Sequence, residues 1–441
     1  MEEPIFRDWL LTVAPRFPRL SSLARAIADD NEWPSGRDEA TLTSRLNALK
    51  SAELVPALVE ALESFEMTCV PTMPDAALPW EWHSELLVEQ SKASTERHSA
   101  NRDVPTYQYR FELGQKLAQA MSRKTRIYVD TCHWVKMRDF EMGRAVSPAY
   151  GEILTHLHRL VDTGRYICPL SPALFMELQT QSDLRTRSHT ARLMEGLSEN
   201  VGMPQLEELE KLELRRFCLD RCFGLGALNT EWQFWRKGST IIVERWPHSD
   251  WMSEKQNWWV QKCLIDSSWD TPFSQIVSVL PECIDTRDMR KRFAERMNAD
   301  RDARPSTDFE YERQRAGAIT IRQFIIPQMP ELFREVQLLA SRRPGFQYPT
   351  EMGSPDPQCL PSVQVLSGIE ALMRTTGRRY RPNDMYDLFH CAAAIPYCQV
   401  FLCDTAFKHI VTDAKLRYPE KYGVTVLASA DEIAAYLSTQ N

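Results

Sequence analysis

Two short apolar segments, far apart in the chain, each end on an aspartate. Residues 127–129 read Ile-Tyr-Val and precede Asp130, and residues 400–403 read Val-Phe-Leu-Cys and precede Asp404. Short apolar runs of this kind are typical of fully buried strands in a parallel sheet. Open parallel sheets form their ligand sites outside the carboxyl ends of the strands. The two segments therefore predict neighbouring strands whose aspartates meet at one edge of an α/β sheet.

Two other stretches place acids in predicted helices. Residues 171–177 read Ser-Pro-Ala-Leu-Phe-Met-Glu, with serine suited to the N-cap and proline to the first helical position, and they end on Glu177. Residues 383–390 open an apolar helix, in which Asp384 and Asp387 share one face near the helix start. The partial positive charge at that helix end lowers the cost of gathering acids.

A cluster of carboxylates is costly unless it binds a cation. Mg²⁺ and Mn²⁺ are hard ions that prefer oxygen ligands, so several carboxylates converging from separate elements suit them. Each acid also has a structural alternative: Asp130 can cap the next helix, Asp387 can cap a helix or pair with an arginine, and Asp404 can stabilise a turn. Taken together, the acids favour a shared metal site.

The order of these pieces resembles the PIN-domain ribonucleases. The matching pieces are the strand ending on Asp130, the segment ending on Glu177, the helix Asn383-Asp384-x-x-Asp387-x-x-His390-x-Ala392-x-Ala394, and the strand ending on Asp404 with Phe407 after it. In that family an aspartate after the first strand, a glutamate in a following helix and two later aspartates hold magnesium or manganese. The resemblance covers residues 126–180 and 362–440. It implies Asp130, Glu177, Asp387 and Asp404 as catalytic residues and metal ligands, with Asp384 as a further ligand.

Two features depart from the family pattern. The insertion between the second and third pieces is unusually long, and Cys403 stands where the family often has threonine. PIN-type cleavage needs no histidine, so His390 is interpreted as a packed or supporting residue, and His133 is given no catalytic role.

The resemblance implies a divalent-metal-dependent nuclease, most of all an RNA endonuclease, which hydrolyses phosphodiesters with a metal-activated water. It also implies a toxin or an effector of phage defence. A phosphatase of the haloacid dehalogenase type is disfavoured, because that class needs a second aspartate two residues after the first and Cys132 stands there. A catalytically degenerate PIN-like scaffold that binds RNA or organises an assembly stays open as the alternative. The residues do not select RNA over DNA, or endonucleolytic over exonucleolytic cutting.

The net charge of −7 excludes a chain that is basic overall, so any grip on nucleic acid must come from local patches. The best such patch comprises Arg374, Arg378, Arg379 and Arg381, just before the acidic helix. Arg378, Arg379 and Arg381 are the candidate substrate-binding residues, because a phosphodiester needs cations beside the metals that cleave it. Their structural alternative is a solvated loop.

Periodicity divides the chain into five parts. Residues 1–66 predict a small helical module that resembles the YozE-type SAM-like fold, through Phe6-x-x-Trp9-Leu10, Leu23-Ala24-x-x-Ile27-x-x-Asp30 and Trp33-Pro34. Residues 67–122 predict a linker and helices, 123–180 the first part of a PIN-like core, 181–361 a helical insertion, and 362–441 the second part of the core. The expected core is a three-layer parallel-sheet fold. Seven of the twelve tryptophans, from Trp232 to Trp269, fall in the insertion and are interpreted as core residues.

Composition sets the remaining expectations. The chain has 441 residues and is 43% hydrophobic, which indicates a globular protein of two or three domains. No run approaches the length of a membrane span, and the start is not a signal peptide, so a cytoplasmic protein without a membrane partner is expected. The eleven cysteines, including Cys218 and Cys222, are expected to be reduced. A protein partner for the N-terminal module or the insertion, and self-association, are left open.

Overall fold

The computed structural model describes most of the chain at residues 80–223, 233–242, 248–279, 285–321 and 360–440. Nearer the N-terminus it describes residues 18–68 except 29, 31 and 35–38, together with residues 7, 10 and 11. Some residues named in the predictions lie outside this description, namely the side chains of Cys218 and Cys222 and the residues Trp232 and Trp246.

A four-stranded parallel sheet forms the centre of the molecule, in the order β2-β1-β5-β6. Its strands are β1 (Thr125–Val129), β2 (Tyr166–Ile167), β5 (Val400–Leu402) and β6 (Thr425–Leu427). β1 and β5 pair directly, with Ile127 opposite Val400 and Val129 opposite Leu402. The prediction that these two distant segments form neighbouring strands is therefore confirmed, and both strands end at the same edge.

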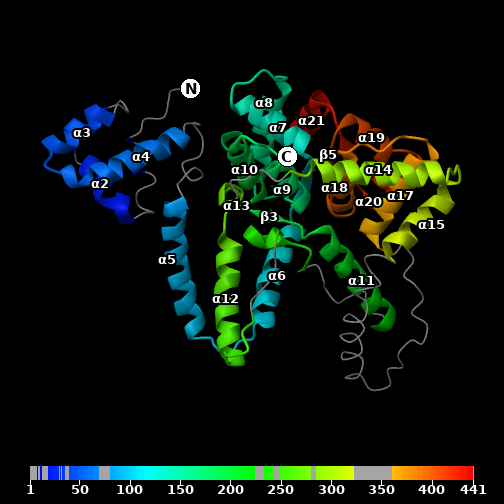
Figure 1. The fold of residues 1–441 in the computed structure, drawn as a ribbon, viewed down its shortest axis with the longest axis horizontal. Helices are drawn as coiled ribbons and strands as arrows, with labels where there is room; N and C mark the ends of the chain where they lie inside the picture. The colour runs from blue at the N-terminus through cyan, green and yellow to red at the C-terminus, as the bar shows by residue number, and fades with distance from the viewer. Residues whose placement is uncertain are drawn as a thin grey trace.

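Helices make up most of the rest of the core, so the fold is of the α/β class with a small parallel sheet (Figure 1). The helices from the first part of the chain are α7 (Thr131–Glu141), α8 (Ala149–Asp162) and α9 (Pro172–Gln179). Those from the last part are α17 (Pro361–Thr375), α18 (Asp384–Tyr397), α19 (Thr405–Val411), α20 (Tyr418–Tyr422) and α21 (Ala430–Ser438). α8 packs against α7 and α21, whereas α18 packs against α9, α17 and β5.

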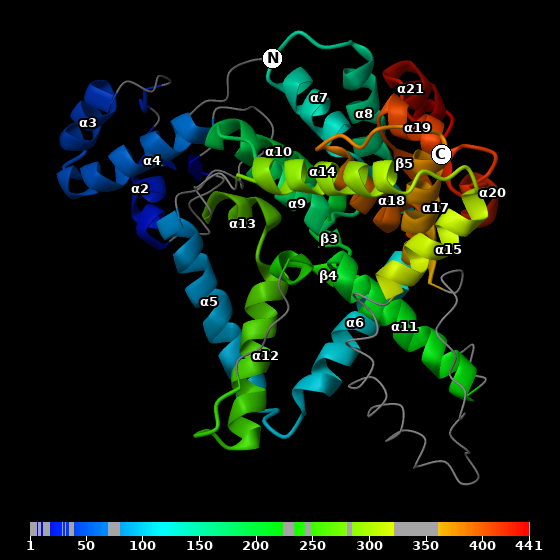
Figure 2. The ribbon, with the colours of Figure 1, turned by 45° about the vertical axis from the view of Figure 1, so that its right-hand side comes forward.

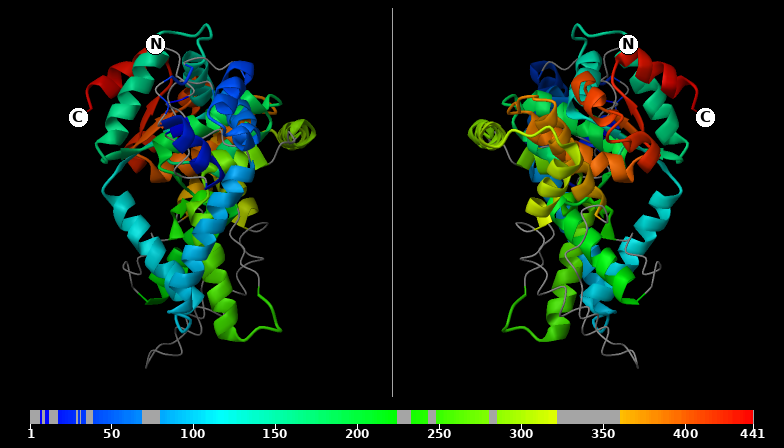
Figure 3. Two further views of the ribbon diagram at one scale, coloured as in Figure 1. Left: turned by 90° about the vertical axis from the view of Figure 1, so that its left-hand side faces the viewer. Right: turned by 90° about the vertical axis from the view of Figure 1, so that its right-hand side faces the viewer.

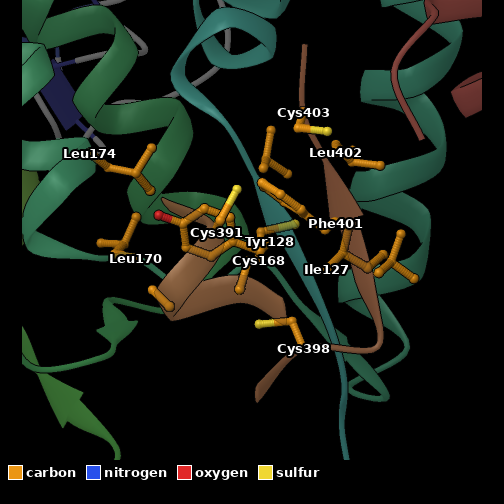
Figure 4. Close-up of a cluster of buried hydrophobic side chains, with 14 of the residues drawn as sticks. Ile127, Tyr128, Cys168, Leu170, Leu174, Cys391, Cys398, Phe401, Leu402 and Cys403 are labelled. Atoms are coloured by element: carbon orange, nitrogen blue, oxygen red, sulfur yellow. The ribbon is translucent and has the colours of Figure 1, made fainter. Parts of the chain in front are cut away.

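The hydrophobic core explains why these strands form. Every residue of β5 and the last three residues of β1 are buried, as apolar strands in a parallel sheet require. Tyr128 and Phe401 stand side by side in this core, with ring centroids 5.8 Å apart (Figure 4). Buried residues of the insertion, such as Phe273 and Val277, join the same cluster. This part of the insertion thus packs into the central hydrophobic core and does not form a separate domain with its own core.

The described residues of the insertion are mainly helical. Its helices are α10 (Leu184–Ser198), α11 (Leu206–Phe223), α12 (Glu254–Asp270), α13 (Phe273–Val279), α14 (Arg287–Ala303) and α15 (Phe309–Thr320), with the short 3-10 helix η4 (Gly238–Ile241). It also contains an antiparallel strand pair that the sequence did not indicate, β3 (Val201–Gly202) with β4 (Arg236–Lys237). α15 packs on α17, and α14 packs on α18 (Figure 2).

Three helices form an arm that extends away from the sheet (Figures 1 and 3). They are α5 (Trp80–Ser99), α6 (Thr106–Ser122) and α12. Asp266 of α12 is buried between them and accepts hydrogen bonds from Ser94 (2.6 Å), Arg97 (3.1 Å) and the Tyr109 hydroxyl. Because a buried carboxylate without partners is costly, this network fixes how the three helices align.

The N-terminal helices have a hydrophobic core of their own. They are α2 (Pro18–Ala28), α3 (Glu39–Ala48), the 3-10 helix η2 (Ala52–Leu54) and α4 (Val55–Thr68). Leu10, Leu23, Leu42 and Leu58 are fully buried in this cluster. Trp33 lies in the turn before α3 and is buried.

The tryptophans of the insertion do not behave alike. Trp235 is buried beneath the guanidinium of Arg126, with 5.5 Å between the guanidinium carbon and the ring centroid. Trp251, at the tip of the arm, is 82% exposed, so the interpretation as core residues fails there. Within the described stretches, the helices that we see are all too short or too polar to traverse a lipid bilayer.

Gly368 of α17 gives a test of the core. A methyl group at this position would overlap the hydroxyl of Tyr418, which donates hydrogen bonds to the carbonyl oxygens of Gln364 (3.1 Å) and Val365 (2.9 Å). Glycine to alanine inside a helix usually stabilises by about 1 kcal/mol. We expect Gly368→Ala instead to destabilise by about 1–3 kcal/mol, because the core is overpacked. In a Tyr418→Phe background the cost should shrink, as measured by urea unfolding; an equal cost in both backgrounds would contradict the packing argument.

Candidate metal centre

Asp130 and Asp404 occupy equivalent positions at the ends of the paired strands. Asp130 caps α7 by accepting a hydrogen bond from the backbone N–H of Cys132 (3.0 Å), and Asp404 caps α19 through that of Phe407 (2.8 Å). Each cap uses one carboxylate oxygen, and the described residues give the other oxygen no hydrogen-bond partner. Asp130 and Asp404 can therefore each cap a helix and still present one carboxylate oxygen to a ligand.

Glu177 reaches the same edge from α9. Its Oε2 accepts hydrogen bonds from the Thr131 hydroxyl and from Nε2 of His390, which lies 2.8 Å away. Asp130, Glu177 and His390 each offer a ligand atom, and these atoms all lie within 4.8 Å of one another. The structure therefore brings together two of the predicted acids with a histidine that the sequence interpretation gave a supporting role.

His390 is fully buried and bonded at both ring nitrogens. Nδ1 lies 2.7 Å from the Tyr128 hydroxyl, which lies 2.6 Å from the hydroxyl of Ser171. Burial disfavours the charged imidazolium, but the negative charge and hydrogen bond of Glu177 outweigh burial and raise the pKa of His390 to about 9. An imidazolium here donates to Glu177 and to Tyr128, and Tyr128 then donates to Ser171. His390 thereby places a positive charge beside the acids.

The remaining acids are coupled to one another through their charges. Burial, opposed by His390 and reinforced by Glu177 and Asp404, raises the pKa of Asp130 to about 6. Burial and then the charge of Asp130 raise the pKa of Asp387 to about 8. The carboxylate of Asp387 has neither a hydrogen bond nor an ion pair within the described part of the chain. A half-buried acid left in this state is one that a cation would stabilise.

Asp384 does not join this group. One of its oxygens accepts from Nη2 of Arg378 (3.0 Å), and the other accepts from the backbone N–H of Arg381 (2.8 Å). Although Asp384 and Asp387 are both in the first turn of α18, Asp384 is buried against the preceding loop. The structure thus gives Asp384 a role in closing that loop and does not bring it into the group of Asp130, Glu177 and His390.

Only part of the predicted arginine patch is available to bind nucleic acid. Arg374 is buried and pairs with Asp300 (2.7 Å) and Glu312 (2.7 Å), so it belongs to the core and not to a surface patch. Arg378 also lies over the ring of Phe407, and Arg379 pairs with Asp302 (3.1 Å). The side chain of Arg381 is exposed and carries no ion pair among the described residues. Two of the three predicted substrate-binding arginines are therefore already bound to acids within the protein.

Several residues of the site were not found from the sequence. Tyr128, Thr131 and Ser171 complete the hydrogen bonding of Glu177 and His390, and His133 joins α7 to the carbonyl oxygen of Cys403 (3.0 Å). The sequence predicts Ser171 as a helix cap, and its side chain does cap α9. No sequence spacing reveals these contacts, because each one joins elements that are distant along the chain.

Three comparisons with known proteins, by family models, by curated sequences and by solved structures, find no match to this chain. The geometry of the site thus carries the functional argument.

Asp387→Asn tests the repulsion between the acids. A folded-state pKa of about 8, above the usual value near ~3.9, means that the folded protein binds more protons than the unfolded chain. This group's contribution to stability therefore falls as pH rises from about 4 to 8. Without metal, we expect the variant to be more stable than wild type by about 1 kcal/mol or more at pH 8.5, and the gap to narrow at pH 6.

Asp384→Asn is the matched control on the same helix. It should destabilise the protein at both pH values, because it breaks the partly buried ion pair with Arg378. Thermal unfolding of the three proteins with chelator present measures the difference. If Asp387→Asn is less stable than wild type at pH 8.5, the acids are not in mutual repulsion.

Proposed function

We propose that this chain is a divalent-metal-dependent nuclease with a PIN-like core, and most specifically an RNA endonuclease. The proposal is carried by one observation: the carboxylate of Asp387, which has no hydrogen bond or ion pair among the described residues, lies within reach of the charges of Asp130, Glu177 and Asp404 at the carboxyl edge of the parallel sheet. The preference for RNA rests on the resemblance of the ordered motif to the PIN-domain ribonucleases. A role as a toxin or in phage defence is part of the same proposal.

The donor set suits Mg²⁺ or Mn²⁺. The four acids come from separate parts of the chain: Asp130 and Asp404 are the N-caps of α7 and α19, Glu177 is in α9 and Asp387 is in α18. Among the described residues, Asp130, Glu177 and Asp404 are each held by a hydrogen bond that leaves one carboxylate oxygen unbonded. Hard cations of this type favour carboxylate oxygens and keep several waters. Asp130, Glu177, Asp387 and Asp404 would hold the ion. Bound there, it would supply a Lewis acid and lower the pKa of a water ligand.

The protein's own residues have distinct tasks in this proposal. The two helix caps hold Asp130 and Asp404 in fixed orientations, so little reorganisation is needed when a cation arrives. His390 keeps Glu177 ionised, because its charge and hydrogen bond lower the pKa of Glu177 despite burial. An ionised Glu177 or Asp387 can orient an attacking water toward a phosphodiester. No histidine has to transfer a proton.

Asp130→Asn tests the proposed function. The substitution keeps the volume of the side chain and removes one charge, so cleavage of RNA with saturating Mn²⁺ or Mg²⁺ should fall by ~100-fold or more. Asp384→Asn should retain much more activity, because Asp384 bonds the arginine loop and not the cluster. Labelled transfer RNA, messenger RNA and single-stranded DNA, with metal or chelator, provide the assay.

The outcomes separate the candidates clearly. If Asp130→Asn cleaves RNA at the wild-type rate, Asp130 is not part of the active site. Metal binding and RNA binding without cleavage of any substrate would favour the alternative of a catalytically inactive RNA-binding scaffold.

A further inference from the structure

Arg290, in the helical insertion, lies beside the first turn of α18. Its Nη1 donates to Oδ1 of Asn383 at 2.6 Å, and its guanidinium carbon is 5.8 Å from the ring centroid of Tyr386. Asn383 immediately precedes the helix that carries Asp387. The positive charge of Arg290 also helps to lower the pKa of Glu177, so the guanidinium lies within electrostatic reach of the acidic cluster.

Arg290, like Arg381, forms no ion pair with a carboxylate among the described residues. Arg374, Arg378 and Arg379 each form an ion pair with a carboxylate. The described residues offer Arg290 no such pair, and its Nε is buried without a hydrogen-bond partner. A guanidinium has five N–H donors in a planar fork that matches phosphate oxygens. Apart from the buried Nε and the bond to Asn383, the remaining N–H groups of Arg290 have no hydrogen-bond partner among the described residues and can meet an anionic ligand.

The position of Arg290 is fixed by the docking of α14 along the loop before α18. Asn298 exchanges two hydrogen bonds with the backbone of Tyr380, at 2.9 and 3.0 Å, and Arg301 donates to the carbonyl oxygen of Arg378 at 3.0 Å. With the Arg290–Asn383 bond, these contacts attach the helix over most of its length (Figure 2). A cation held in this way does not have to be ordered when a ligand binds.

We propose that Arg290 binds a phosphate oxygen of the nucleic-acid substrate at the acidic cluster, so that the helical insertion completes the active site. The inference rests on the proposed nuclease function. The acids at this edge repel a phosphodiester, and Arg290, which has no ion pair among the described residues, lies beside the first turn of the helix that carries Asp387. It supplies the role that the sequence assigned to Arg378 and Arg379, which are neutralised by Asp384 and Asp302.

Binding of RNA to the full chain tests this role separately from cleavage. A fluorescent single-stranded RNA is titrated with Mg²⁺ into an Asp130→Asn protein, alone and with Arg290→Ala added. We expect Arg290→Ala to weaken binding about tenfold and to reduce the salt slope by about 0.7, the value for one lost contact on a single strand. With Asp130 intact, Arg290→Ala should raise KM for RNA, while the affinity for Mn²⁺ stays within about twofold.

Two further variants serve as controls for this test. Arg292→Ala removes an exposed charge from the same helix and should change RNA affinity by less than about twofold. Arg290→Gln can still donate to Asn383 but loses the charge, so it should behave as Arg290→Ala if phosphate binding matters, and as wild type if Arg290 only fastens α14. Thermal unfolding checks that each variant folds.

The results distinguish the two hypotheses. If RNA binds and Arg290→Ala and Arg290→Gln bind it as tightly as the parent, Arg290 is not a phosphate ligand and the inference fails, whereas the nuclease proposal stands. If no variant binds or cleaves RNA or DNA, the proposed function itself fails, and this inference with it.

Discussion

Repulsion among the carboxylates at the end of β1 and β5 is the interaction on which the rest of the site depends. The paired strands end at the same edge with Val129 opposite Leu402, and Asp130 and Asp404 follow them by one and two residues, close enough for their charges to interact. Glu177 and Asp387 then add two charges to a buried space in which burial already disfavours ionisation. The raised pKa values of Asp130 and Asp387 and the positive charge of His390 offset this cost. Sites with such displaced pKa values are typical of functional centres.

The surrounding structure keeps this unfavourable arrangement in place. The capping bonds of α7 and α19 stabilise the helices and, at the same time, prevent the two aspartates from turning away. Tyr128 and Ser171 fix the ring of His390 from inside the hydrophobic core. A second set of acids neutralises nearby arginines: Asp300 pairs with Arg374 of α17, and Asp384 and Asp302 pair with Arg378 and Arg379 of the adjacent loop. Among the described residues, these arginines beside the site are therefore held in ion pairs within the protein, and few charged groups there are left without an ion pair.

The sequence predicted what depends on short-range patterns. The strand pair, the cap at Ser171 and the start of α18 follow from apolar runs and local turn chemistry, and the structure has all three. Asp384 and Asp387 could not be separated from the sequence, since both lie in the first turn of one helix. Their difference comes from Arg378, whose side chain turns back onto Asp384. The roles of Arg290 and of the α14 docking required three-dimensional contacts across about ninety residues.

Anomalous diffraction from crystals grown with Mn²⁺ tests the central claim most directly, because it locates the ion without reference to activity. The account predicts a manganese peak bounded by the carboxylates of Asp130, Glu177, Asp387 and Asp404, and loss of that peak in crystals of Asp130→Asn. Well-diffracting crystals at saturating Mn²⁺ with no peak at this edge of the sheet, or with the ion held only elsewhere in the molecule, would contradict it.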